Sequence, residues 1–248
     1  MTSKVTLCVI ANGLLLLSWS GRAFGYRPFD GTDANVAAPR EVELEVGPIG
    51  YERQGSTHHL VAPALVLNYG VHPGFEAVLE GRQRWPINSP QASELEDVAL
   101  SLKSMLRAGS LQGEHGVSVA LETGALLPGS ERRFGAHVAS IFSFQWPALV
   151  LHINLDNDLL TSLQYTATGS AILEGPFGWP VRPVGELLVA RDVGEGQVPH
   201  ALTRSALVGA IATWSDAWVF DIAFRHGVAS GQNEDEVRVG FTWSFAVR

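Results

Sequence analysis

The chain has 248 residues, a formal net charge of −8, and 46% apolar against 17% charged residues. This length allows one large domain, and the high apolar content excludes an intrinsically disordered chain. The acidic balance argues against nucleic acid as a partner, because phosphate binding requires a basic surface.

The first 25 residues have the features of a secretory signal peptide. Lys4 precedes an apolar run over residues 5–19, and small residues follow up to Gly25. The run is short for a membrane-spanning helix of roughly 20 residues, so we predict cleavage between Gly25 and Tyr26. Cleavage would remove two basic residues, taking the net charge from −8 to −10, and the only cysteine, Cys8. The mature chain would then have no thiol for a disulfide or for thiolate chemistry.

The last stretch, residues 233–248, alternates in polarity. From Val237 to Val247 every odd position is apolar or aromatic, and the even positions are polar or small. This period of two is typical of a β-strand with one apolar face. An exposed strand of this kind promotes aggregation in a soluble domain, but it is the usual closing strand of an outer-membrane barrel. The edge strand of a soluble sandwich is the alternative.

The same alternation recurs along the chain about every 15 to 20 residues, the spacing of a barrel strand and its turn. The first strand is expected to start at Glu41, and the tenth to cover residues 201–213 with Leu207, Gly209 and Ile211 facing outward. With the C-terminal strand the stretches make an even number, twelve, as bacterial barrels require. We therefore predict an all-β fold, a single antiparallel transmembrane β-barrel of about 12 strands.

The predicted barrel occupies residues 41–248, with both termini periplasmic. Residues 26–40 are irregular and rich in Asp, Pro and Ala, and are expected to form a periplasmic lead-in or a small plug. Tryptophans fall at or near the predicted strand ends, where the aromatic girdles of a membrane barrel lie. They are Trp85, Trp146, Trp179, Trp214 and Trp218.

Residues 93–106 fit two secondary structures. As a helix, Ser93 and Glu96 would form a capping box, and apolar residues recur at helical spacing. As a strand, alternate positions from Val98 to Leu102 are apolar. The strand is favoured, because the neighbouring stretches alternate and a lone helix would have no partner.

The predicted inward faces carry many charged residues and one histidine. The acids are Glu41, Glu43, Glu45, Glu76, Glu80, Asp97, Glu122, Glu174, Glu186, Asp221 and Glu236; the others are Arg82, Lys103, His152, Arg182, Arg225 and Arg238. One interpretation is that these groups pair with each other to fill a narrow lumen, because an unpaired buried charge is costly. The other is a polar pathway that favours cations. We weigh pairing slightly higher.

Several short motifs resemble a known family, the outer-membrane proteins assigned to the MetA pathway of phenol degradation. The motifs are Arg27-Pro28-Phe29, Thr32-Asp33-Ala34, Glu43-Leu44-Glu45, residues 63–70, Asp97-Val98 with Lys103, and residues 240–245. The similarity of pattern extends over most of the mature chain. The resemblance implies a transporter-like barrel for aromatic or other hydrophobic small molecules, with no catalytic residues to carry over.

The sequence shows no motif for a hydrolase elbow, a zinc protease or a phosphate-binding loop, and we predict no cofactor. Asp156-Asn157-Asp158 is similar to the start of a calcium loop but lacks the later ligands, so a polar turn is favoured. His58 and His59 could bind a metal, but adjacent strand residues point to opposite faces, and a role at a loop tip is favoured.

We therefore predict a non-enzymatic channel in the bacterial outer membrane for passive passage of small molecules. Its expected partners are outer-membrane lipid, a small-molecule solute and the barrel-assembly machinery. A structural barrel that transports nothing is the first alternative. An outer-membrane lipid hydrolase using His152 ranks lower, because His152 falls on the predicted inward face, away from lipid.

Overall fold

The computed structural model describes residues 27–87, 89–130, 134–193, 202–229 and 231–247. The predicted signal peptide and its cleavage site, Gly25 and Tyr26, lie outside the described residues. Over the described ranges the chain folds into these strands: β1 (Glu41–Gln54), β2 (Thr57–His72), β3 (Phe75–Pro86), β4 (Glu94–Arg107), β5 (Ser118–Leu126), β6 (Gly135–Gln145), β7 (Val150–Leu160), β8 (Tyr165–Glu174), β9 (Val181–Val193), β10 (Leu202–Thr213), β11 (Trp218–Ala229) and β12 (Gln232–Ala246). A short 3₁₀ helix, η1 (Ser110–Gln112), precedes β5. None of the helical residues in these ranges makes a helix long and apolar enough to cross a membrane.

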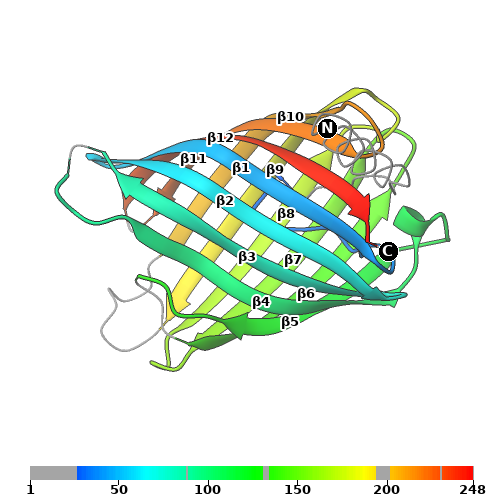
Figure 1. Ribbon diagram of the computed structural model, residues 1–248, viewed down its shortest axis with the longest axis horizontal. Coiled ribbons are helices and arrows are strands. Elements are labelled where there is room, and N and C mark those ends of the chain that lie inside the picture. The colour runs from blue at the N-terminus through cyan, green and yellow to red at the C-terminus, as the bar shows by residue number, and fades with distance from the viewer. Residues whose placement is uncertain (1–26, 88, 131–133, 194–201, 230, 248) are drawn as a thin grey trace, which may run out of the picture.

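The strands close into one antiparallel barrel, in which each strand pairs with its neighbours in sequence and β1 pairs with β12 (Figure 1). Glu41 lies opposite Ala246 at one end of this last seam, and Gln54 lies opposite Glu234 at the other. We call these the closure end and the far end. The predicted barrel is confirmed, and residues 93–106 form a strand rather than a helix.

The two faces of the wall differ as the alternation predicts. Large apolar side chains lie exposed on the outer face, among them Leu65, Leu67, Leu79, Leu100, Leu102, Leu155, Leu187, Val189, Val208, Phe220 and Ile222. The inner face buries charged and polar side chains, among them Glu43, Glu76, Lys103, His152 and Glu186. A continuous apolar exterior of this kind is expected of a surface in contact with lipid.

The facing of β10 is opposite to the prediction. Leu207 and Ile211 are buried inside the barrel at 2% and 0% exposure, whereas Val208 is 63% exposed on the outside. The predicted outward set was wrong because both faces of this strand are small or apolar, so the period of two carries no polarity. One smaller correction applies to β7. Asp156 to Asp158 belong to this strand rather than to a polar turn.

Irregularities in strand pairing change whether odd or even residues face inward in β1 and β2. In β1 the register shifts between Val46 and Ile49, so that odd residues such as Glu45 face inward before it and even residues such as Glu52 after it. A similar shift between Val61 and Ala64 affects β2. An extra residue reverses the facing of the rest of the strand.

Aromatic side chains gather at the closure end. Trp218 stacks on Trp243 with 5.4 Å between ring centroids, and Trp243 lies 4.4 Å from Phe245. Trp146 and Trp214, in turns at the same end, are also exposed. This arrangement matches the aromatic girdle at a membrane interface.

Candidate functional site in the barrel lumen

Residues 27–40, which we call the lumen segment, run through the interior of the barrel before β1 begins. Their backbone N–H groups donate to inward side chains from strands around the whole wall. Arg27 donates to Glu45 of β1 (3.1 Å), Asp30 and Gly31 to the two oxygens of Glu186 of β9 (2.9 Å each), Thr32 to Asn154 of β7 (3.1 Å), Ala34 to Ser143 of β6 (2.9 Å) and Ala37 to Glu76 of β3 (2.5 Å). Partners on opposite walls mean that the segment crosses the lumen, where the blue trace of Figure 1 lies.

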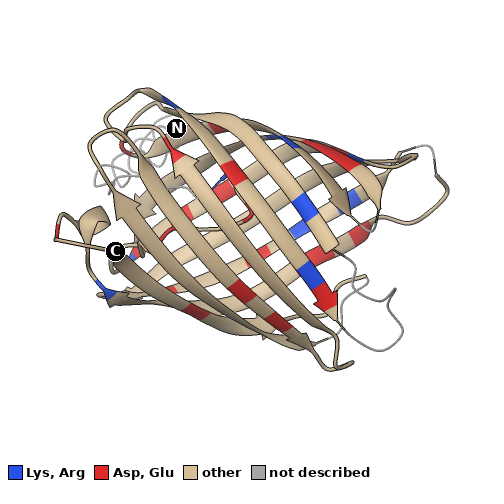
Figure 2. Cartoon of the chain, turned by 180° about the vertical axis from the view of Figure 1, so that it is seen from behind, with Lys and Arg blue, Asp and Glu red and all other residues tan. Residues whose placement is uncertain are grey.

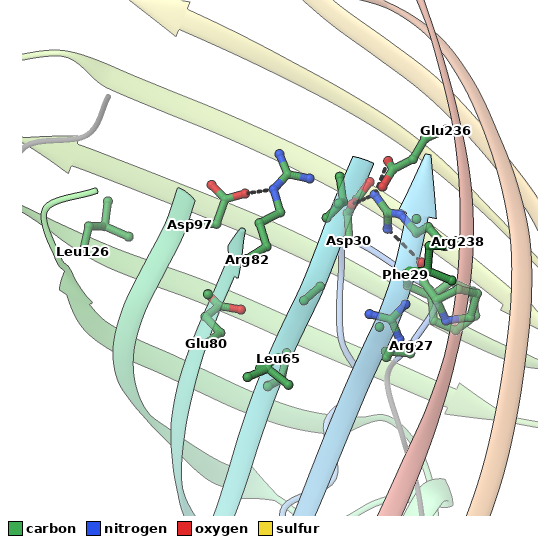
Figure 3. A pocket seen from close by; sticks show the side chains of 18 of the residues that line it. Arg27, Phe29, Asp30, Leu65, Glu80, Arg82, Asp97, Leu126, Glu236 and Arg238 are labelled. Atoms are coloured by element: carbon green, nitrogen blue, oxygen red, sulfur yellow. Dashed lines mark hydrogen bonds and ion pairs between the residues drawn. The ribbon is translucent and has the colours of Figure 1, made fainter. Parts of the chain in front are cut away.

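Near its start, at Asp30, the lumen segment is held by two arginines of the wall. The carboxylate of Asp30 accepts from Arg238 of β12 at 2.6 Å and from Arg225 of β11 at 2.9 Å, as Figure 3 shows for Arg238. Arg238 also donates to the carbonyl of Pro28 at 2.8 Å. Burial by itself would raise the pKa of Asp30, but the two guanidinium groups outweigh it and hold the pKa well below its ordinary value.

Apolar contacts fix the same segment at two points. Phe29 packs against an inward cluster formed by Val184, Ile211 and Val219. Ala34, with 0% exposure, packs with Ala120, Ala139 and Ile141. Ile211 of β10 therefore has a function that the alternation did not reveal, because it forms part of the surface on which Phe29 packs.

Two wall glycines make room for the segment. A Cβ at Gly70 would lie 1.9 Å from the carbonyl oxygen of Ala38, and one at Gly240 would lie 2.2 Å from the side chain of Arg27. Real Cβ atoms do not come so close to other atoms, so the segment approaches the wall this closely at these two positions because the side chain is missing there.

A buried row of hydrogen-bonded polar side chains begins at Ser143, which accepts from the N–H of Ala34. Ser143 Oγ is 2.8 Å from His152 Nδ1, His152 Nε2 is 3.1 Å from Glu174, and Arg182 donates to Glu174 at 2.8 Å. The order serine, histidine, carboxylate is that of a hydrolase triad. Here, however, Ser143 has 0% exposure and its backbone pairs with β5 and β7 on both sides, so neither substrate access nor backbone oxyanion donors are present at it.

Ion pairs fill the lumen toward the far end. Arg82 pairs with Asp97 at 2.9 Å and with Glu96 at 3.1 Å, and Arg84 pairs with Glu52 at 2.8 Å. The acidic and basic bands of Figure 2 lie on strands all around the barrel. Cross-pairing of inward charges, the interpretation weighed slightly higher from sequence, therefore describes much of this region.

Two cavities remain beside the lumen segment. One has a volume of about 360 Å³ and reaches toward the far end, with Arg82, Asp97 and Leu126 in its lining (Figure 3). The other has a volume of about 300 Å³ and is lined by carboxylates together with Lys103. Arg27, Phe29, Asp30, Val66, Glu80 and His137 line both. The cavities therefore adjoin each other along the segment.

The predicted lumen residues fall into two groups in the structure. Those buried between wall and segment are Glu41, Glu43, Glu45, Glu76, Lys103, His152, Glu174, Arg182, Glu186, Asp221 and Glu236. Those that line a cavity or join the far-end ion pairs with part of the side chain open are Glu80, Arg82, Asp97, Glu122, Arg225 and Arg238. Their role in solute passage stays a prediction.

Sequence reasoning missed several lumen groups. Glu52 faces inward because the register shift in β1 reverses its parity, whereas Arg84 keeps the even parity of Arg82 in β3 and was not singled out. Asn154 and Ser143 carry no charge and were not singled out, although both hold the segment. Asp30 lies in a stretch without periodicity, so no pattern could assign it a partner.

Metal binding finds no support among the described residues, which contain no group of three His, Cys, Asp or Glu side chains placed to hold an ion. His58 and His59 lie in β2, not at a loop tip. His58 is 2.6 Å from the hydroxyl of Tyr51, and His59 is 3.1 Å from Arg84. The histidine pair is thus divided between the two faces of the strand.

No protein-family model matches the chain, and no curated protein sequence does. Among solved structures, it is similar to the NanC porin at 10% identity and a TM-score of 0.59, over 82% of this chain and 98% of that one. The KdgM porin is 14% identical with a TM-score of 0.52, over 82% and 99%. A KdgM porin in complex with disordered oligogalacturonate is also 14% identical, with a TM-score of 0.53 over the same shares.

The chain has the fold of a porin-like barrel. At these identities the similarity establishes the fold alone. Membership of the MetA-pathway family stays a prediction.

Proposed function

We propose that the chain is a channel of the bacterial outer membrane through which small solutes diffuse. The observation that most supports this proposal is the closed barrel, which has an apolar exterior and a polar interior with two adjoining cavities. A closed barrel satisfies all its backbone groups in lipid and keeps its inward side chains in an aqueous interior. The similarity in fold to the NanC and KdgM porins supports this function.

The same observations support the partners. Outer-membrane lipid would contact the exposed leucine and valine belt, and the stacked tryptophans would lie at one interface. We place the closure end in the periplasm, as for a chain exported by the predicted signal peptide and inserted by the barrel-assembly machinery. In this proposal residues 1–25 are the signal peptide, residues 26–40 are the stretch that contains the lumen segment, and residues 41–248 are the barrel.

The solute is a small polar molecule, in view of the charged cavity walls. The aromatic solutes that the family resemblance implies would meet Phe29, which lines both cavities beside Asp30 and Arg27. A ring with a hydroxyl or amino substituent would suit this lining better than a hydrocarbon, because its polar group could replace the hydrogen bonds of displaced water.

A hydrolase is the second candidate, favoured only by the contacts among Ser143, His152 and Glu174. The burial of Ser143 and the pairing of its backbone argue for a non-enzymatic role. The absence of turnover of lipid and aryl esters by the purified protein would remove this candidate.

The first test is made on purified protein. Unboiled protein from the outer-membrane fraction should migrate differently from boiled protein in a denaturing gel, because a folded barrel resists detergent. In planar bilayers it should then give discrete current steps. Protein in the soluble periplasmic fraction would refute the location. A folded barrel that passes no ions or small solutes, in the wild-type chain or in a variant with a weakened lumen segment, would refute the channel and favour a structural barrel.

A further inference from the structure

We propose that the lumen segment is an inhibitory gate: residues 27–40 close the barrel, and solutes pass only when the segment swings away toward the closure end. This inference rests on the proposed channel function. It follows from where the segment lies, how it is held, and what happens to its partners when it leaves.

The segment lies across the path. Its partners Glu45, Ser143 and Glu186 come from β1, β6 and β9, which are separated around the barrel in both directions. Both cavities are bounded by Arg27, Phe29 and Asp30. A solute moving from the far end therefore reaches the segment before it reaches the closure end.

The contacts that hold the segment are reversible. Many are hydrogen bonds from backbone N–H groups to polar side chains of the lumen, such as Glu186, Asn154 and Ser143. Water that enters the lumen can form hydrogen bonds with both the N–H group and the side chain. The net free energy by which each bond holds the segment is therefore small. The wall strands, by contrast, are held by continuous ladders on both sides.

Asp30 is the latch of this gate. It joins Arg225 and Arg238, which are on different strands, to the segment. Both arginines also contact Glu236, at 2.9 Å and 2.8 Å. The wall side of the latch therefore stays paired when Asp30 leaves, which lowers the cost of opening relative to a pair that would leave a buried charge alone.

The covalent tether lies at the other end of the segment. Arg40 has a positive φ of 66°, the N–H of Glu41 donates to the carbonyl of Ala38 at 2.8 Å, and β1 pairs with β12 from Glu41 onward. Arg40 itself is held to the wall, because its N–H donates to the carbonyl of Gly70 at 2.8 Å and its carbonyl accepts from the N–H of Val247 at 2.7 Å. Opening thus consists of a rotation about residues 38–39, ahead of Arg40, with the barrel unchanged.

The first experiment compares Asp30→Asn with the wild type in planar bilayers. Removing the charge should raise the fraction of time in the open state several-fold without changing the gel mobility shift of the folded barrel. Asp216→Asn is the matched control, since Asp216 lies exposed in the turn between β10 and β11. Equal conductance of all three folded proteins would contradict the role of Asp30.

The second experiment locks the segment to the wall. An ideal Cβ at Gly31 would lie 2.5 Å from Ser170 Oγ on β8, so cysteines at both positions are within reach of a disulfide, whose Cβ atoms are typically about 3.5–4.5 Å apart. Asn154, 2.8 Å from the same Cβ position, must shift its side chain. The oxidised Gly31→Cys/Ser170→Cys protein should lose its conductance and regain it on reduction, whereas each single variant should be insensitive to reductant.

The outcomes separate the gate from the channel. If the oxidised and reduced double variant conduct equally while the wild type conducts, the gate is wrong and the channel stands. If neither the wild type nor Asp30→Asn nor the reduced double variant conducts, although all show the folded gel mobility, both proposals fail. Conductance of Asp30→Asn, together with loss of conductance in the oxidised double variant, would support both proposals.

Discussion

At the scale of single residues, much of the lumen segment is held by its backbone N–H groups, which donate to side-chain acceptors on the wall. Glu186 shows this most directly, because its two oxygens accept from two consecutive backbone N–H groups. Ser143 plays the same part for Ala34, while also contacting His152. These side chains therefore stabilise a chain segment, and catalysis is not needed to explain why they are buried.

His152 provides a test of this interpretation. Replacing it with alanine removes its contacts to Ser143 and Glu174, and should destabilise the barrel by about 1–3 kcal/mol, the cost of leaving buried partners unsatisfied. The midpoint of the heat-induced gel shift should fall while conductance persists. His152→Gln, which can keep one hydrogen bond, serves as the control and should fall less. Loss of an esterase activity in His152→Ala with unchanged stability would instead support the hydrolase.

The pH dependence of the gate follows from Asp30. Because its arginine partners lower its pKa from the ordinary value of 3.8, the stabilisation is complete above that value and is lost only as the pH falls through the lower pKa of the folded protein. We expect the same open fraction at pH 5 and at pH 7.5 in bilayer recordings. Opening on acidification within this window would show that another group controls the latch.

At the scale of elements, polarity set the facing of most strands but not of β10. Its small and apolar residues on both faces permit either orientation, and the choice is made by pairing with β9 and β11. Once that register is set, Leu207 and Ile211 face the lumen and Val208 faces outward.

Spin labels on β10 test this facing in vesicles. A label at Val208→Cys should collide readily with oxygen dissolved in lipid, because the position is 63% exposed on the outer face. The adjacent Leu207→Cys label should collide less with oxygen, because its side chain points into the lumen. The reverse pattern of oxygen collision would restore the orientation expected from sequence.

At the scale of the whole molecule, acidic residues outnumber basic ones in the chain, with 25 against 17, and many of the acids face the lumen. Burial raises the electrostatic effect of such groups on a passing ion. The polar lumen and the apolar exterior together support the proposed membrane channel.

The open channel should therefore prefer cations. In a potassium chloride gradient, the reversal potential of Asp30→Asn should have the sign of potassium selectivity. Glu80→Gln and Asp156→Asn, both in the wall of the 300 Å³ cavity, should reduce that potential, while Asp216→Asn in the exposed turn should not. A chloride-selective potential would show that the arginines at the far end control permeation.

The sequence by itself determined the barrel, the strand count and most inward positions, because alternation is a local property that each strand carries in its own residues. It identified residues 93–106 as a strand for the same reason. Only the tertiary structure decided which groups meet: Asp30 with Arg225 and Arg238, or Phe29 with the inner face of β10. These contacts join residues far apart in the chain, and closure of the barrel around the lumen segment places them together. No local pattern encodes that geometry.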